Sequence, residues 1–219
     1  MKVAVLYSGG KDSTASLRWA RDAGHTVECL IGVVPEAYDS FMYHVPGTEL
    51  VDLFAEALGE RLVKVIAPEH DELRPLKKAL SEQGVEGVVS GAVRSEFQKL
   101  RLDRISAGLG MVHLAPLWHI DPVKHVEALI ADGYDIIFTA VAAEGLDVSW
   151  LGRRLDRAAL EDLRKAGQRH GINIEGEGGE YETLVRFGPT HRKRIVLDRF
   201  RTHWRRDSGR LMIEAAHLE

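Results

Sequence analysis

Hydrophobic and polar residues follow a repeated pattern through the first half of the chain. A short apolar run, Val3–Leu6, precedes a segment whose apolar residues recur at helical spacing and which ends near Gly24. These apolar residues are Ala15, Leu17, Trp19, Ala20 and Ala23. The pattern therefore predicts that the chain opens with a strand, a tight turn and a helix.

The alternation continues to about residue 114. Strands are predicted at Thr26–Val34, Leu62–Ile66, Gly87–Ser90 and Val112–Leu114, and helices at Glu49–Leu58, Asp71–Gln83 and Ser95–Leu109. Strands that alternate with helices form right-handed βαβ units. We therefore expect an α/β domain with a Rossmann-like parallel sheet that carries helices on both faces.

The pattern changes after Pro116-Leu-Trp118. The second half is predicted to contain a helix from Asp121-Pro122 to about Asp132, a strand at Ile136–Val141, a helix at Asp156–His170, and a hairpin over Arg194–Trp204 and Arg210–Ala215 with its turn at Asp207-Ser-Gly209. We expect one domain over residues 1–117 and a smaller α+β domain over residues 118–219.

The composition excludes several classes of protein. The 219 residues are 45% hydrophobic, which is enough to build a buried core. No stretch is long and apolar enough to cross a membrane, so a cytoplasmic protein is expected. The single cysteine, Cys29, excludes an internal disulfide and a CxxC metal site. A net charge of −4 gives no general attraction for nucleic acid, so no direct nucleic-acid partner is expected.

The turn between the first strand and the first helix, SGGKDS at residues 8–13, combines residue types that suit a phosphate group. Backbone N–H groups at a helix start and the helix dipole both stabilise an anion. Ser8 and Ser13 add hydroxyl donors, and Gly9 and Gly10 allow the backbone to approach a ligand closely. Lys11 adds a mobile cation, and the carboxylate of Asp12 caps the helix or holds Mg²⁺. Its spacing matches neither the Walker A nor the GxGxxG pattern. An ordinary strand–helix connection is the alternative, but six such residues together favour a phosphate loop.

The same segment resembles the pyrophosphate-binding loop of the PP-loop ATP pyrophosphatase family. This resemblance implies a fold of the adenine nucleotide alpha hydrolase (HUP) type, ATP and Mg²⁺ as cofactors, and catalytic roles for Lys11 and Asp12. Members activate a carbonyl as an acyl adenylate, from which nitrogen or sulfur displaces AMP. Because Cys29 falls in a predicted buried strand, nitrogen transfer is favoured over sulfur transfer, with free ammonium as the simplest donor.

Four later segments are similar to the archaeal diphthine–ammonia ligase family. They are Phe41-Met-Tyr-His44, Ser95-Glu-Phe-Gln-Lys-Leu-Arg101, Glu144-Gly-Leu-Asp-Val-Ser-Trp-Leu-Gly-Arg153 and Gly176-Glu-Gly-Gly-Glu-Tyr-Glu-Thr183. The similarity extends over nearly the whole chain, although Trp118-His-Ile-Asp121 departs from the family, which often has Gly-Arg between Trp and Asp. It implies ATP-dependent amidation of diphthine on translation elongation factor two to diphthamide, with release of AMP and pyrophosphate.

The acidic segment Gly176–Glu182 is assigned to the substrate through this resemblance. Three carboxylates lie among three glycines, a sequence too flexible for a helix and too polar for a core strand. We expect it to bind ammonium or the trimethylammonium group of diphthine. Glu177 and Glu180 are expected to be catalytic, with Glu180 taking the proton that ammonia loses, and Glu182 is expected to contact the substrate together with Glu180. A solvated turn is the alternative.

Further candidate residues border the predicted nucleotide crevice. We expect His44 to contact phosphate, Gly91 and Ala92 to let adenine approach the backbone, and Gln98 and Arg101 to meet phosphate or the incoming protein. An ordinary turn or a solvated surface is the alternative for each of these residues.

In the second domain, Gly145 and Asp147 are expected to shape a substrate loop, and Trp150 is expected to lie in the core.

The predicted function is that of an amide ligase whose partners are elongation factor two and ammonium. Two alternatives stay open: a PP-loop amide ligase that acts on a different carboxylate, and a non-catalytic nucleotide-binding module. Formation of AMP and pyrophosphate only when an acceptor is present would separate the enzymes from the module. The oligomeric state is also open, and it includes a homo-oligomer.

Overall fold

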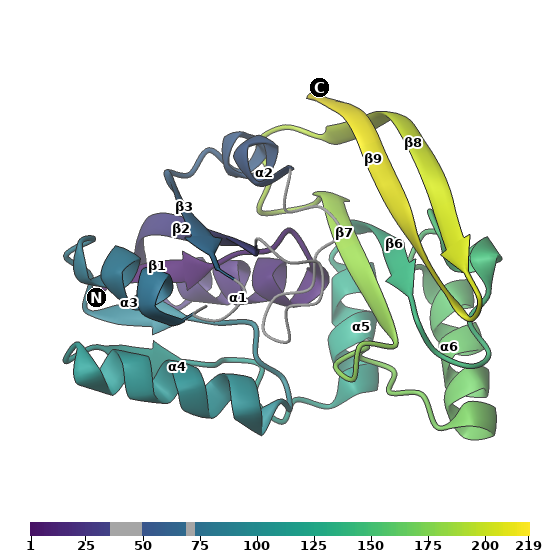
Figure 1. Cartoon of the computed structure of the whole chain (residues 1–219), viewed down its shortest axis with the longest axis horizontal. Helices are drawn as coiled ribbons and strands as arrows, with labels where there is room; N and C mark the ends of the chain where they lie inside the picture. The colour runs from purple at the N-terminus through teal and green to yellow at the C-terminus, as the bar shows by residue number, and fades with distance from the viewer. Residues whose placement is uncertain (36–49, 69–72) are drawn as a thin grey trace. The chain divides into compact units, whose positions relative to one another are not determined.

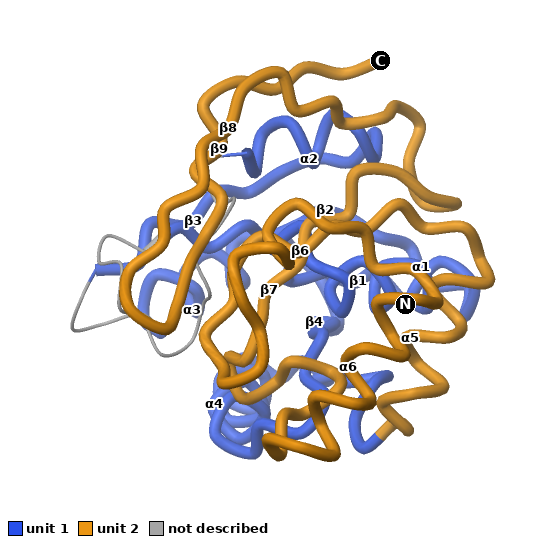
Figure 2. The backbone as a smooth tube through the Cα atoms, turned by 90° about the vertical axis from the view of Figure 1, so that its right-hand side faces the viewer, with its two compact units in different colours: residues 1–119 blue, residues 120–219 orange. Residues whose placement is uncertain are grey.

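The computed structural model describes residues 1–35, 50–68 and 73–219 of the chain (Figure 1). These residues form two compact units, Met1–His119 and Ile120–Glu219 (Figure 2). Each unit is built on its own sheet. Within the described ranges, no helix is both long enough and apolar enough to cross a membrane.

The first unit contains a five-stranded sheet in the order β3-β2-β1-β4-β5. Its strands are β1 (Lys2–Leu6), β2 (Thr26–Pro35), β3 (Leu62–Ala67), β4 (Gly87–Val89) and β5 (Val112–Leu114). All neighbouring strands are parallel. The central strands are short apolar runs, as parallel strands covered on both faces require. The predicted α/β fold with a Rossmann-like parallel sheet is confirmed.

Helices cover both faces of this sheet. They are α1 (Lys11–Asp22), α2 (Val51–Leu58), α3 (Leu73–Ser81) and α4 (Glu96–Gly108). The buried cluster on one face combines Ala4, Cys29 and Ile31 of the strands with Leu76 of α3 and Leu102 of α4. On the other face, Tyr7 bonds the hydroxyl of Thr14 in α1 at 2.9 Å and meets the ring of Phe54 in α2 edge-on. The two faces are thus covered by α1 with α2 and by α3 with α4.

The second unit contains a four-stranded antiparallel sheet in the order β7-β6-β9-β8. Its elements are α5 (Pro122–Ala131), β6 (Asp135–Val141), the 3-10 helix η2 (Val148–Trp150), α6 (Arg157–His170), β7 (Tyr181–Phe187), β8 (Ile195–Arg205) and β9 (Ser208–Leu218). Asp121 caps α5 by accepting the N–H of Lys124 at 2.9 Å, with Pro122 in the first turn as the sequence predicted. The smaller α+β unit is confirmed.

Two residues that were expected in the core lie there. Cys29 is fully buried in β2, and burial raises the pKa of its thiol. Trp150 is buried in the second unit, where its ring lies edge-on to Phe138 at 5.0 Å between centroids. Both side chains therefore stabilise the core.

Two local predictions were wrong. Tyr181 and Glu182, expected in the flexible acidic segment, begin the strand β7 (Tyr181–Phe187), because Tyr181, Leu184 and Val185 are buried and their packing outweighs the polarity of Glu182. The hairpin turn lies at Arg206-Asp207, since Arg205 pairs with Ser208.

Gly209 therefore lies in β9 rather than in the turn, opposite Trp204. A Cβ there would lie 2.3 Å from Trp204 Cε3, so this glycine makes room for the indole.

Candidate nucleotide site and acidic segment

The segment Ser8–Ser13 begins where β1 ends and continues into α1. β1 lies between β2 and β4. The helices that connect β1, β2 and β3 (α1 and α2) lie on one face, and the helices that lead into β4 and β5 (α3 and α4) lie on the other. The carboxyl end of β1 therefore adjoins a topological switch point, where open α/β sheets bind ligands. This is the position at which a phosphate loop is expected.

Hydrogen bonds fold the segment back on itself. The Ser13 hydroxyl donates to the Gly10 carbonyl at 3.0 Å and accepts the N–H of Ser8 at 3.3 Å. Gly10 is the N-cap residue of α1, and no side chain caps the helix from that position. Because the N–H groups of a first helical turn require acceptors from outside the helix, this end of α1 suits an anion.

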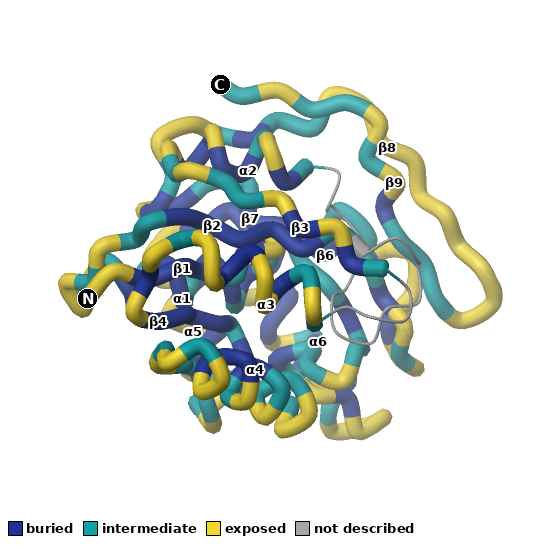
Figure 3. Tube along the Cα trace, turned by 60° about the vertical axis from the view of Figure 1, so that its left-hand side comes forward, coloured by how far each residue is buried: buried dark blue, intermediate teal, exposed yellow. Residues whose placement is uncertain are grey.

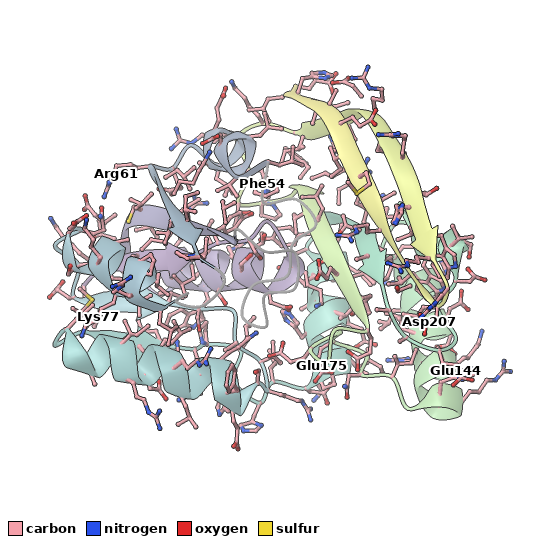
Figure 4. All side chains as sticks on the ribbon, in the orientation of Figure 1. Phe54, Arg61, Lys77, Glu144, Glu175 and Asp207 are labelled. Carbon is pink, nitrogen blue, oxygen red and sulfur yellow. The ribbon has the colours of Figure 1, made fainter. Side chains whose placement is uncertain are left out.

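Two glycines hold the backbone of this site close to its neighbours. Gly9 has a φ of +83°, and a Cβ there would lie 2.4 Å from Phe54 Cε2, on the α2 side chain labelled in Figure 4. Gly91 follows β4, and a Cβ there would lie 2.9 Å from the backbone of Asp12 and Ser13. The structure thus brings Gly91, with Ala92 beside it, against the first turn of α1.

Lys11 is buried, with only 4% of its surface exposed, and its ammonium group donates to Asp12 Oδ2 at 2.9 Å. A cation at the positive end of a helix is unfavourable unless negative charge lies nearby. The Asp12 carboxylate supplies part of that charge. A phosphate group at this end of the helix would supply more.

Asp12 also offers carboxylate oxygen to a divalent cation. In the part of the chain that the structure describes, no group of three His, Cys, Asp or Glu side chains is placed to hold a metal ion. Mg²⁺ is usually held by one or two carboxylates together with phosphate oxygens and water. The residues therefore fit a Mg²⁺ ion that binds with the phosphates of a nucleotide rather than a metal centre made of protein ligands alone.

A partly buried relay of side chains begins at the end of the neighbouring strand β4. The hydroxyl of Ser90 lies 2.8 Å from His113 Nε2, and His113 Nδ1 lies 2.6 Å from Asp103 Oδ1. Lys99 donates to the other oxygen of Asp103 at 2.8 Å. Burial lowers the pKa of His113, which favours the neutral ring that donates to Asp103 and accepts from Ser90.

Ser90 also joins the end of β4 to the first helix. The Ser90 carbonyl accepts the hydroxyl of Ser16 in α1 at 3.1 Å, so both polar groups of Ser90 are bonded. Sequence reasoning missed the relay, because its members come from β4, α4 and β5 and form no local motif. The relay thus ties the end of β4 to β5 and α4, and the bond from Ser16 ties it to α1.

Gln98 and Arg101 lie in the first part of α4. Ser95 caps this helix by accepting the N–H of Gln98 at 3.4 Å. The guanidinium group of Arg101 stacks on the Phe97 ring, 3.8 Å from its centroid. Their expected contact with phosphate or protein stays a prediction. His44 lies outside the described residues.

Glycines shape the acidic segment in the second unit. Gly176 and Gly179 have φ values of +74° and +84°, and a Cβ on Gly178 would lie 2.7 Å from Glu180 Oε1. The Glu180 carboxylate therefore folds back over the segment, where Oε1 accepts the N–H of Asn173 at 3.1 Å. Among the described residues, none donates a hydrogen bond to the buried Oε2 of Glu180. This oxygen is available to a donor that the protein itself does not supply.

Glu182 lies on β7 rather than in the loop. It pairs with Ala140 of β6, and Ala140 pairs in turn with Arg210 of β9. Burial raises the pKa of Glu182 to about 8, and the positive charge of Arg210 opposes this increase. The carboxyl group is therefore mostly protonated at neutral pH, although it can ionise when a cation binds nearby. Glu177 precedes both residues, and its catalytic role stays a prediction.

The loop that contains Gly145 lies between β6 and η2. Gly145 has a φ of +89°, and a Cβ there would lie 2.6 Å from His170 Cδ2. Hydrogen bonds from the hydroxyl and the N–H of Ser149 lower the pKa of Asp147. Gly145 and Asp147 thus fix the loop conformation, whereas their contact with a substrate stays a prediction. Glu144, labelled in Figure 4, lies 3.4 Å from His170 Nδ1.

Comparison with known proteins gives matches along nearly the whole chain. The model of the diphthamide synthase N-terminal domain matches residues 1–113, and the model of the diphthamide synthase C-terminal domain matches residues 121–218. A protein of Danio rerio named diphthine–ammonia ligase is 33% identical over 222 residues, which cover 90% of this chain and 87% of that protein. The Homo sapiens protein of the same name is 31% identical over 223 residues, covering 90% of this chain and 83% of that protein.

A Schizosaccharomyces pombe protein, also named diphthine–ammonia ligase, is 34% identical over 220 residues, covering 90% of this chain but 36% of that protein. Among solved structures, a Methanocaldococcus jannaschii protein described as a predicted subunit of tRNA methyltransferase aligns with a TM-score of 0.46 at 19% identity. That alignment covers 88% of this chain and 99% of the other.

Proposed function

The chain belongs to the diphthamide synthase family, and on that basis we propose that it is an ATP-dependent amide ligase that converts diphthine to diphthamide. The main structural support is the segment Ser8–Ser13, which lies at the switch point of a parallel sheet. It forms a glycine-rich helix start without a side-chain cap, and it contains the buried Lys11. Such a site suits the triphosphate of a nucleotide. Family membership supports the identity of the acceptor.

In the first proposed step, a carboxylate oxygen of diphthine attacks the α-phosphorus of ATP. A new P–O bond forms, the bond from the α-phosphorus to the oxygen that bridges to the β-phosphate breaks, and pyrophosphate leaves. The N–H groups at the start of α1 and the ammonium group of Lys11 would offset the charge that develops on pyrophosphate. A Mg²⁺ ion held by Asp12 and the phosphates would add to this charge neutralisation. The product is an acyl adenylate.

In the second proposed step, ammonia attacks the carbonyl carbon, the C–N bond forms, and the C–O bond to AMP breaks. Ammonium must lose one proton before the attack, and the attacking nitrogen loses a second one afterwards. Glu180 Oε2, which accepts no hydrogen bond from the described residues, would accept one from ammonium. Glu182, with a pKa of about 8, could exchange a proton at neutral pH. We therefore assign ammonium capture to Glu180 and proton transfer to Glu182.

We propose that the protein partner is translation elongation factor two carrying diphthine. We assign ATP binding to the domain predicted over residues 1–117. The acidic segment Gly176–Glu182, which we assign to the substrate, belongs to the domain predicted over residues 118–219. A ligase that acts on a different carboxylate would use the same activating residues. The acceptor therefore has to be tested directly.

The test incubates the protein with ATP, Mg²⁺, ammonium and elongation factor two that carries diphthine. AMP release and the conversion of the carboxylate to an amide, located by peptide mass spectrometry, are followed together. AMP formed only with the factor, alongside the amide, is the expected result. AMP without the amide would redirect the search to another acceptor, and no AMP in any mixture would leave a nucleotide-binding module.

A further inference from the structure

The β8–β9 hairpin is the most exposed element of the second unit. Figure 3 shows its strands mostly as exposed and intermediate residues, and every residue from Asp198 to Asp207 is exposed. Phe200 and Met212 are 48% and 38% exposed. Among the described residues, the hairpin pairs with the rest of the sheet at Ala140 and Val141 of β6. Most of its surface is therefore open to a partner.

The turn of this hairpin lies at the same end of the sheet as the acidic segment. Gly209, close to the turn, pairs with Val141, and Val141 pairs on its other side with Tyr181, where β7 begins. The adjacent Ala142 donates its N–H to the Glu180 carbonyl at 2.8 Å. Neighbouring strands lie about 4.8 Å apart, so the base of the turn is about 10 Å from the acidic segment.

The positive charge of the hairpin is concentrated at its turn. Between residues 198 and 214 there are five arginines and three carboxylates. Arg199 and Arg201 both pair with Glu214. In the part of the chain that the structure describes, Arg205 and Arg206 form no ion pair. Two guanidinium groups without an ion pair thus lie in the turn, next in the sequence to Asp207, which Figure 4 labels.

The backbone of Arg206 in the turn has a conformation that is energetically unfavourable for a residue with a side chain. Arg206 has a φ of +57°, in the left-handed region that favours glycine. Its carbonyl accepts the indole N–H of Trp204 at 2.9 Å, and the indole covers Gly209. Trp204 is therefore held in one orientation, while 36% of its surface remains exposed. Fixed aromatic rings and arginines are the residues that contribute most to protein–protein binding.

We propose that this turn, Trp204–Asp207, is a docking surface for the protein that carries diphthine, and that it binds carboxylates on that protein close to the modified side chain. This inference rests on the proposed function, because a reaction on a side chain of a folded protein brings the surrounding protein surface to the rim of the acidic segment. A nucleic-acid partner is disfavoured, because the chain carries a net charge of −4.

The decisive variant is the double substitution Arg205→Ala with Arg206→Gly. Glycine suits the left-handed backbone at position 206, so the hairpin should keep its fold and its thermal midpoint. We expect this variant to bind diphthine-bearing elongation factor two roughly 10-fold more weakly, measured by fluorescence anisotropy, with an equal increase in KM and no change in kcat. Arg157→Ala, at an exposed position of α6, is the matched control and should leave both values unchanged.

The outcomes separate this inference from the proposed function. Amide formation with the same KM in the double variant would overturn the docking surface and leave the proposed function intact. If the wild-type protein forms no amide but the double variant still binds the factor more weakly than the wild type, the docking surface is supported and the proposed function is refuted. Binding of a single-stranded RNA oligonucleotide that depends on Arg205 and Arg206, with unchanged binding of the factor, would also overturn the inference.

Discussion

Replacing Glu182 with glutamine tests the electrostatics of the acidic segment. Burial raises the pKa of Glu182 from 4.5 to about 8, and the charge of Arg210 opposes part of this increase. Between these two pH values the native protein keeps a proton that the unfolded chain has released. The unfolded state therefore binds fewer protons, and the free energy of unfolding must fall as the pH rises through this interval.

The size of the effect follows from the two pKa values. One pH unit corresponds to about 1.36 kcal/mol at most, and the slope is smaller near pH 4.5, where half of the unfolded chains still carry the proton. Glu182 should therefore lower the free energy of unfolding by roughly 3 kcal/mol between pH 4.5 and pH 7. By pH 8, where the native carboxyl group is half ionised, the loss should reach roughly 4 kcal/mol. Glutamine has nearly the same shape and does not titrate. The Glu182→Gln protein should therefore lack this loss and be more stable than the wild type at neutral and alkaline pH.

Urea unfolding at several pH values between about 5 and 8 measures this difference directly. The gap between Glu182→Gln and wild type should widen by about 1.4 kcal/mol for each pH unit, and groups that titrate equally in both proteins cancel. Arg210→Met removes the charge that opposes the burial effect, so it should extend the decline beyond pH 8. Parallel stability curves for wild type and Glu182→Gln would refute the reasoning.

Four further substitutions test other parts of the molecule. Lys11→Ala should lower AMP formation by at least about 100-fold with an unchanged thermal midpoint, and normal turnover would contradict the phosphate loop. Gly91→Ala should destabilise the fold by about 1–3 kcal/mol in urea unfolding and weaken ATP binding in calorimetry, since its Cβ meets the α1 backbone. His113→Phe should cost about 1–3 kcal/mol in the same unfolding assay, because it removes the partner of the buried Ser90 hydroxyl and one hydrogen bond to Asp103. Cys29→Ala should retain turnover in the AMP assay, and its loss would favour sulfur transfer.

Local patterns predicted most of the fold because local physics determines it. The helix that starts at Pro122 was predictable from Asp121 as its cap, and the C-cap of α6 from Gly171, whose φ is +73°. β7 was missed because the burial of Tyr181 and Leu184 depends on distant partners, which polarity along the sequence does not show.

In the candidate site, too, the contiguous residues could be predicted from the sequence, and the residues that folding brings together could not. The segment Ser8–Ser13 is contiguous, so its residues could be named before the structure was known. The relay through Ser90, Asp103 and His113 could not, because tertiary packing alone brings these side chains together. The raised pKa of Glu182 likewise comes from burial in the folded sheet rather than from its neighbours in the sequence.

The contact between Gly9 and Phe54 has a consequence for protein engineering. The ring of Phe54, on α2, fills the space that a side chain at position 9 would take. A designer who transplants Ser8–Ser13 alone into another parallel sheet would leave this ring behind and open a gap under the left-handed glycine. We expect such a graft to hold its loop only when an aromatic residue is also placed on the second helix after the loop, the position of α2. The smallest unit that can be transferred is therefore the loop together with a ring from a distant part of the chain.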